Sequence, residues 1–303
     1  MSAPVLRRHS APRPPSEPAA LEVLRLRIET LERDSGARAI AVAVYDTKTH
    51  LTFWHHAERW FHAASTIKVA ILLGVYDAIH RGLLLPHSRL HVRNRFRSAV
   101  DAFPFRVLAD RDSNSEVHAA IGKMLRIDQL AHHMIATSSN LATNLLLDLV
   151  GLDAVQRTLD ELGLSGIDVR RGVEDERAFD QGINNRVTAG GLVGLLHLIA
   201  DERAFTPELS RQMLDVLHAQ EFKNGIPARL PPAVRVAHKT GDISTVAHDA
   251  GVVYPPGRAP YVIAVLTEWS PDSSGRSATI AEASHAVFEL LTSLDGEPEA
   301  LDG

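Results

Sequence analysis

Ser65 and Lys68 place a hydroxyl and an amine three residues apart, at the start of an apolar run that ends at Leu73. Residues i and i+3 of a helix lie on the same face, so these two side chains are expected to approach each other. A serine hydroxyl is a poor nucleophile near neutral pH unless a neighbouring group takes its proton. The pair therefore predicts a serine nucleophile that is activated by a lysine.

Two further motifs carry residues of the same chemical types. Ser138 and Asn140 stand at a predicted helix start, and Lys239, Thr240 and Gly241 follow one another at the end of a predicted strand. They add a second hydroxyl, an amide and a second amine to the Ser65–Lys68 pair, whose spacing alone is a weak signal.

Lysine at these positions fits proton transfer. Lys68 can accept a proton only when it is neutral, and lowering its pKa by about three units toward 7 costs on the order of 4 kcal/mol. Burial and the like charge of Lys239 can supply this shift. The chain has 27 arginines and only 5 lysines, yet two of these lysines stand in the motifs. Arginine cannot give up its proton and so cannot serve as the base.

The hydrophobic pattern predicts the elements that position these residues. Helical spacing of apolar residues predicts a first helix at 19–33 and a last helix at 277–291, and the block 82–200 is predicted to be helical. Strands at both ends of the chain around this block imply one sheet, covered by the terminal helices, with a helical lobe and a cleft beside it. The predicted strands are 39–45, 51–54, 234–240, 247–254 and 261–267.

The order and spacing of the three motifs resemble those of the class A β-lactamases over almost the full chain. The resemblance implies an α+β fold of the β-lactamase/transpeptidase type, in three layers. A five-stranded antiparallel sheet is flanked by the terminal helices, and an all-helical lobe lies across the active-site groove. Proline-rich composition indicates a disordered lead-in at 1–18, which is followed by a catalytic domain at 19–294 (α/β lobe at about 19–66 and 203–294, helical lobe at about 67–202) and a tail at 295–303.

The resemblance also implies how the acyl-enzyme forms. Ser65 is the nucleophile that becomes acylated, and Lys68 is its proton partner. Ser138 relays a proton to the departing nitrogen. Asn140 holds Lys68 and an amide of the substrate.

The resemblance also implies that the third motif, Lys239-Thr240-Gly241, binds the substrate. Lys239 and Thr240 bind the substrate carboxylate, and Gly241 lets the substrate lie close to its strand. The backbone N–H groups of Ser65 and Asp242 form the oxyanion hole, in which each donor contributes roughly 3 to 4 kcal/mol.

Hydrolysis of the acyl-enzyme requires a second base, for which the resemblance points to Glu174. The chain departs from the family here, because Ala178 stands where an asparagine is expected and Ser139 stands where the second motif usually has aspartate. Asp175 or Glu176 could replace Glu174 as the base, or this loop could have no such role. Nearby candidates for the missing amide are Asn184 and Asn185.

Composition narrows the chemistry further. A formal net charge of -5 and the lack of a basic block argue against a nucleic-acid partner, and the absence of cysteine removes thiolate chemistry. The pairs His55-His56 and His132-His133 are interpreted as surface or packing residues, since no His-Glu-x-x-His occurs. We therefore expect no metal and no cofactor.

The first 17 residues are rich in proline and lack an apolar run, which is not typical of an export signal. Arg7-Arg8 leaves twin-arginine export open. No apolar run is long enough to cross a bilayer. We expect a cytoplasmic monomer without membrane contact.

The favoured function is a serine hydrolase that forms an acyl-enzyme on Ser65 and hydrolyses the amide bond of a β-lactam. The partner is then a small-molecule amide or ester. One alternative is a D-alanyl peptidase or small-ester hydrolase of the same fold. Another is a module that captures penicillin covalently with little turnover, which Ala178 suggests.

Overall fold

The computed structural model describes residues 17–294 of the chain. The predicted tail at 295–303 and the predicted lead-in up to residue 16 lie outside these residues. Residues 17 and 18, which the prediction placed in the lead-in, belong instead to helix α1 (Glu17–Ser35).

A five-stranded antiparallel sheet forms the centre of the molecule, in the order β10-β11-β12-β1-β2. Ala43 pairs with Ala264 at the junction between the first and the last parts of the chain. The sheet is therefore assembled from both chain ends, as the sequence predicted, and β10 is an edge strand. The strands are β1 (Ala39–Asp46), β2 (Thr52–His55), β10 (Arg235–Ile243), β11 (Val246–Tyr254) and β12 (Tyr261–Glu268).

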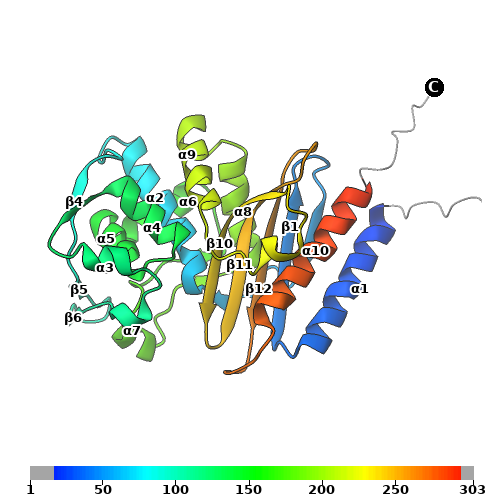
Figure 1. Ribbon diagram of the computed structural model, residues 1–303, viewed down its shortest axis with the longest axis horizontal. Helices are drawn as coiled ribbons and strands as arrows, with labels where there is room; N and C mark the ends of the chain where they lie inside the picture. Colours follow the sequence, from blue (N-terminus) through cyan, green and yellow to red (C-terminus); the bar gives the residue numbers. More distant parts are fainter. Residues whose placement is uncertain (1–16, 295–303) are drawn as a thin grey trace, which may run out of the picture.

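Strand β1 shows how the sheet separates two layers, because successive side chains point to opposite faces. Its branched residues Ile40, Val42 and Val44 join the core under α1 and α10 (Arg276–Leu294). These two terminal helices lie side by side over that face (Figure 1). The small residues of β1 join the core on the other face: Ala39, Ala41 and Ala43.

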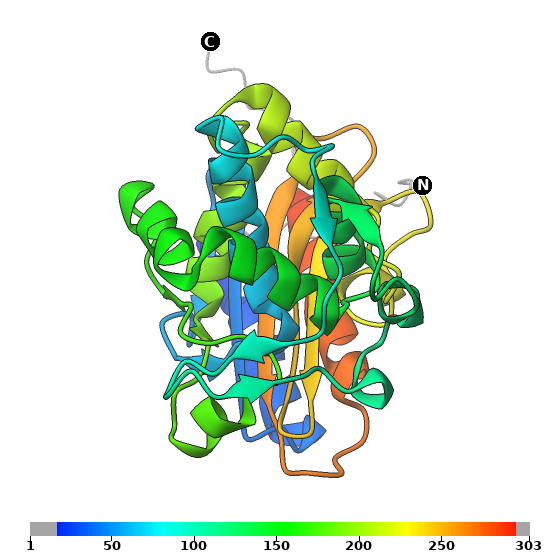
Figure 2. The same cartoon turned by 90° about the vertical axis from the view of Figure 1, so that its left-hand side faces the viewer.

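The second face of the sheet is covered by α8, which contacts β1, β11 and β12. Further helices pack beyond it and form the side of the molecule that faces the viewer in Figure 2. No helix within residues 17–294 combines the length and apolar character needed to span a bilayer. The helices of this side are α2 (Lys68–His80), α3 (Ser115–Ala119), α4 (Ile127–Ala136), α5 (Asn140–Val150), α6 (Leu152–Glu161), α7 (Glu176–Asp180), α8 (Ala189–Ala200) and α9 (Pro207–His218).

Short strands that the sequence did not indicate lie within and just before the block predicted to be helical. They form a two-stranded β4-β7 pair, a β5-β6 pair and a three-stranded β3-β9-β8 group. Each has only two or three residues, too few for an alternating pattern to emerge. They are β3 (Phe61–His62), β4 (Arg89–His91), β5 (Phe96–Arg97), β6 (Pro104–Phe105), β7 (Met124–Arg126), β8 (Ile167–Asp168) and β9 (Arg186–Val187).

Two glycines of α8 offer a test of the packing between this helix and the chain before β8. A Cβ at Gly191 would lie 2.6 Å from the carbonyl oxygens of Ser165 and Gly166, whereas a Cβ at Gly194 would meet only a Leu164 methyl at 3.9 Å. Gly191→Ala should therefore lower the free energy of unfolding by about 1–3 kcal/mol. Gly194→Ala should leave it unchanged or raise it by up to about 1 kcal/mol, because alanine favours a helix. Urea unfolding curves would measure both, and equal effects of the two changes would contradict this packing.

Candidate active site

A cleft opens beside the edge strand β10, where this strand packs against the 3-10 turn η1 (Ala64–Ile67). It consists of two adjoining cavities of about 300 and about 640 Å³. Both cavities are lined by Ser65, Arg111, Asn140 and Asp242. The structure therefore brings residues from all three sequence motifs to one place.

Ser65 lies in η1, one turn before the α-helix, and not within the α-helix as the sequence predicted. Its predecessor Ala64 adopts a left-handed backbone conformation with φ of 45°. The Ser65 hydroxyl lines both cavities and makes no hydrogen bond to any residue in 17–294. No hydrogen bond therefore joins Ser65 to Lys68 in this structure, and the hydroxyl is open to a ligand.

Lys68 begins α2 and is fully buried. Its amine donates to the carbonyl oxygen of Ser138 at 2.6 Å, to Ser138 Oγ at 3.1 Å and to Asn140 Oδ1 at 2.8 Å. Desolvation lowers the pKa of Lys68 to about 7, although the Asp112 and Glu174 carboxylates oppose this shift. Near pH 7 about half of these amines are neutral and able to accept a proton.

Lys239 is the second fully buried lysine of the site. Its amine donates to Ser138 Oγ at 3.0 Å and to the carbonyl oxygen of Thr240 at 2.8 Å. Burial and then the charge of Lys68 hold the pKa of Lys239 well below its usual value. Burial is the main cause of the low pKa of both lysines, as the sequence predicted for Lys68, and the like charges of the two amines oppose each other's protonation.

The loop before α5 places Ser138 between the two lysines. Ser138 has φ of 58°, which residues other than glycine rarely adopt. The next residue caps α5, since the Ser139 hydroxyl accepts from the backbone N–H of Ala142 at 3.1 Å. The same hydroxyl donates to Asp112 Oδ2 at 3.3 Å. Ser139 therefore supports the loop, a role that serine fills here in place of aspartate.

Gly241 lies where β10 approaches the nucleophile. A Cβ at this position would be 3.1 Å from the backbone nitrogen of Ser65. Glycine thus allows a close contact between β10 and η1 that a larger residue would push apart by a few tenths of an ångström. The next residue is Asp242, so its backbone N–H lies directly after the contact between Gly241 and Ser65. The Asp242 side chain forms an ion pair with Arg276.

Glu174 reaches the site from the loop before α7, with φ of 62°. Its Oε1 accepts from Asn140 Nδ2 at 3.2 Å, and its Oε2 pairs with Arg111 Nη2 at 3.0 Å. Burial raises the pKa of this carboxyl, and Arg111 opposes the rise. Asn140 therefore links Glu174 to Lys68, with one side of its amide on each.

The two acids that follow Glu174 make contacts outside the three motifs. Asp175 is fully buried, caps α7 through the N–H of Ala178 at 3.3 Å and accepts from the N–H of Ala99 at 2.8 Å. Glu176 is exposed and pairs with Arg111. Of the three acidic candidates, only Glu174 lies against residues of the three motifs.

The amides near this loop hold its backbone. Asn185 Oδ1 accepts from the N–H groups of Arg170 and Arg171, at 2.7 and 3.0 Å, and Asn184 Oδ1 accepts from the Arg171 guanidinium at 3.2 Å. The Ala178 side chain is buried. The missing asparagine is therefore not replaced by Asn184 or Asn185.

Sequence reasoning missed two residues of this site. Asp112 accepts from the N–H groups of Asn140 and Leu141, at 3.0 and 2.9 Å, and so holds the loop that carries Ser138. Arg111 covers one oxygen of Glu174. Neither belongs to a local motif, and their partners are 28 or more residues away in the chain, so no sequence signal could have found them.

Comparison with known proteins identifies related sequences over most of the chain. Residues 24–291 match a sequence model described as "Beta-lactamase enzyme family". A beta-lactamase of Streptomyces fradiae is 30% identical over 279 residues, which cover 88% of this chain and 85% of that protein.

Solved structures have the same fold. A class A beta-lactamase from Mycobacterium abscessus shares 25% identity and a TM-score of 0.77, over 89% of this chain and 99% of that one. The structure of PBP-A shares 22% identity and a TM-score of 0.77, over 90% of this chain and 96% of that one. At the latter identity the likeness concerns the fold alone.

Proposed function

Since this chain belongs to the beta-lactamase enzyme family, as a member of its class A, we propose that it hydrolyses the amide bond of β-lactams through an acyl-enzyme on Ser65. The family match and the relatives named beta-lactamase support the reaction. The observation that carries the mechanism is the position of Ser138 Oγ, 3.1 Å from Lys68 Nζ and 3.0 Å from Lys239 Nζ. A hydroxyl between two buried amines is suited to proton relay.

Acylation requires a base that is neutral at working pH. Ser65 Oγ attacks the β-lactam carbonyl carbon, and its proton passes to the neutral amine of Lys68. As the ring C–N bond breaks, the proton returns from Lys68 through Ser138 Oγ to the departing nitrogen. The net result is an ester on Ser65 and an opened ring with an N–H.

Charge on the carbonyl oxygen is stabilised at the contact between η1 and β10. The N–H groups of Ser65 and Asp242 serve as the oxyanion hole, supported by the close approach at Gly241. Lys239 and Thr240 lie on the same strand and bind the substrate carboxylate. Burial and Lys68 hold the pKa of Lys239 low, and the negative charge of an incoming carboxylate raises it and so favours the protonated amine.

Deacylation is assigned to Glu174. Its carboxylate takes a proton from water, which attacks the ester carbonyl and releases Ser65. The raised pKa of this group makes it a better base than an exposed carboxylate. The ion pair with Arg111 and the absence of an amide at Ala178 both oppose this step.

A second candidate function follows from those two features. If the Arg111 ion pair holds Glu174 too firmly, the protein captures a β-lactam on Ser65 and releases it slowly. It would then act as a sensor or a sink. The expected small-molecule partner is the same in both cases.

The adduct time course separates these functions. The purified protein is mixed with a penicillin, quenched at intervals and weighed by intact-mass spectrometry, while hydrolysis of a chromogenic cephalosporin is followed by absorbance. An adduct on the peptide that contains Ser65, together with steady cephalosporin turnover, is expected of the enzyme. A persistent adduct without turnover selects capture. Ester hydrolysis without any β-lactam reaction rejects the proposal.

The mechanism does not depend on three further predictions: the boundary between the two lobes, the monomeric state and the cytoplasmic location. Gel filtration with light scattering would measure the mass of the protein in solution.

A further inference from the structure

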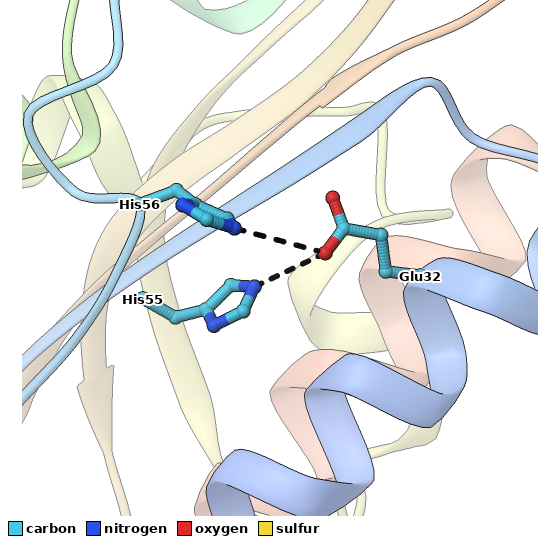
Figure 3. A group of neighbouring side chains, drawn as sticks. All are labelled: Glu32, His55 and His56. Carbon is cyan, nitrogen blue, oxygen red and sulfur yellow. Dashed lines mark hydrogen bonds and ion pairs between the residues drawn. The ribbon is translucent and has the colours of Figure 1, made fainter.

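We propose that Glu32, His55 and His56 bind a zinc ion, which ties helix α1 to the end of strand β2. The Nε2 atoms of both histidines point toward Glu32 Oε2, at 3.3 Å from His55 and 3.9 Å from His56 (Figure 3). One potential ligand atom from each of the three residues lies within 4.8 Å of the other two. Among residues 17–294 no other group of three such ligands is equally close.

The separations match neighbouring ligand atoms around a metal. With zinc bonds of about 2.0–2.2 Å, adjacent ligands of a tetrahedral site are about 3.3–3.6 Å apart. His55 and Glu32 already have this spacing, and His56 has to approach by a few tenths of an ångström. As a hydrogen bond, by contrast, 3.3 Å is long, and 3.9 Å is beyond the normal range.

The backbone of His56 brings the two imidazoles together. Consecutive residues of a strand point to opposite faces, so adjacent histidines normally diverge. His56 follows the last residue of β2 and adopts φ of 48°, which is unusual for a residue other than glycine. As a result the two ring centroids are only 4.2 Å apart.

The carboxylate is already oriented for a ligand. Glu32 Oε1 accepts from the N–H of Ile40 at 2.9 Å, which leaves Oε2 directed at the histidines. Such support of a ligating group by a second hydrogen bond is typical of metal sites.

The environment of the cluster also favours a cation. The carboxylates of Glu32 and Glu29 both act on His55 and favour a positive charge at this place, whereas the His56 imidazole opposes it when protonated. The His56 side chain is 56% exposed, whereas that of His55 is 6% exposed. Zinc can therefore enter from the His56 side, where water fills the fourth position.

Sequence reasoning favoured a surface or packing role for His55-His56. The structure adds a carboxylate from α1, 23 residues earlier in the chain. No local motif marks that distance. The pair His132-His133 forms no such group of three among the described residues, although Glu116 lies 3.8 Å from His133, and it provides a matched comparison.

The test uses the full-length protein after treatment with EDTA. Isothermal titration with zinc chloride should show about one equivalent bound, and zinc should raise the melting temperature. His56→Asn should weaken the affinity at least about tenfold, since loss of an outer-shell partner already costs this much. Asparagine tolerates the left-handed backbone, so the melting temperature in EDTA should stay that of the wild type.

Two further variants complete the experiment. Glu32→Gln keeps an acceptor for the N–H of Ile40 and should also lose zinc affinity and the zinc-dependent rise in melting temperature. His132→Ala should bind zinc as the wild type does. The proposal fails if the wild type shows no saturable binding, or if His56→Asn and Glu32→Gln bind zinc as tightly as His132→Ala.

Discussion

Replacing Ser65 by alanine should lower kcat/KM for a chromogenic cephalosporin by at least about 10⁴-fold, to the background rate. The Ser65 hydroxyl faces both cavities without a hydrogen-bond partner in residues 17–294. The other central hydroxyl, that of Ser138, is engaged by two amines. Of these two hydroxyls, only that of Ser65 is therefore free for the attack. The absorbance assay measures the rate, and intact mass should show no adduct.

A serine outside the cleft provides the matched control for this change. The Ser273 hydroxyl donates to the carbonyl oxygen of Ser270 at 2.8 Å, in the loop before α10. Ser273→Ala should keep the wild-type rate within about twofold. If Ser65→Ala retains more than about 1% of the activity, Ser65 is not the nucleophile.

Much of the fold could be predicted because its determinants are local in the sequence. The alternation of β1 shows in the sequence as branched residues at Ile40, Val42 and Val44 between alanines. The apolar run after Lys68 gives a buried helix. The class A fold is therefore confirmed, whereas strands of two or three residues such as β8 carry no pattern to detect.

The chemistry of the site was less predictable, because it depends on contacts between distant segments. The spacing of Ser65 and Lys68 predicted a direct contact, but the Lys68 amine is directed to Ser138 and Asn140. These partners are more than 70 residues away from Ser65, and only the folded chain fixes their distance. The ion pair between Arg111 and Glu174 also joins segments that are distant in the sequence.

The loop around Glu174 shows that the sequence alone could not identify a single residue of the site. Glu174, Asp175 and Glu176 are adjacent acids, and spacing alone could not choose among them. A left-handed backbone at the first and a helix cap at the second direct them to different places. Local backbone conformation of this kind is set by the fold around it, so the choice required the structure.

Glu174→Gln should convert turnover into trapping. The acyl-enzyme should still form on Ser65, but its hydrolysis should slow by about 10²- to 10⁴-fold, because glutamine cannot take a proton from water. Intact mass should then show nearly complete and persistent adduct where the wild type shows a transient one. In the wild type the step requires the carboxylate, whose pKa is raised by burial. Deacylation should therefore be lost as the pH falls, and lost already above the ordinary glutamate pKa.

Glu176→Gln is the matched control, because it removes an acid from the same loop that also pairs with Arg111. Glu176 is exposed and has no hydrogen bond to Asn140, whereas Glu174 Oε1 accepts from that amide. Its variant should deacylate within a few-fold of the wild type. If Glu176→Gln traps the acyl-enzyme and Glu174→Gln turns over like the wild type, the base is Glu176 and not Glu174. Rapid turnover by both variants would mean that a group other than these two acids activates the water.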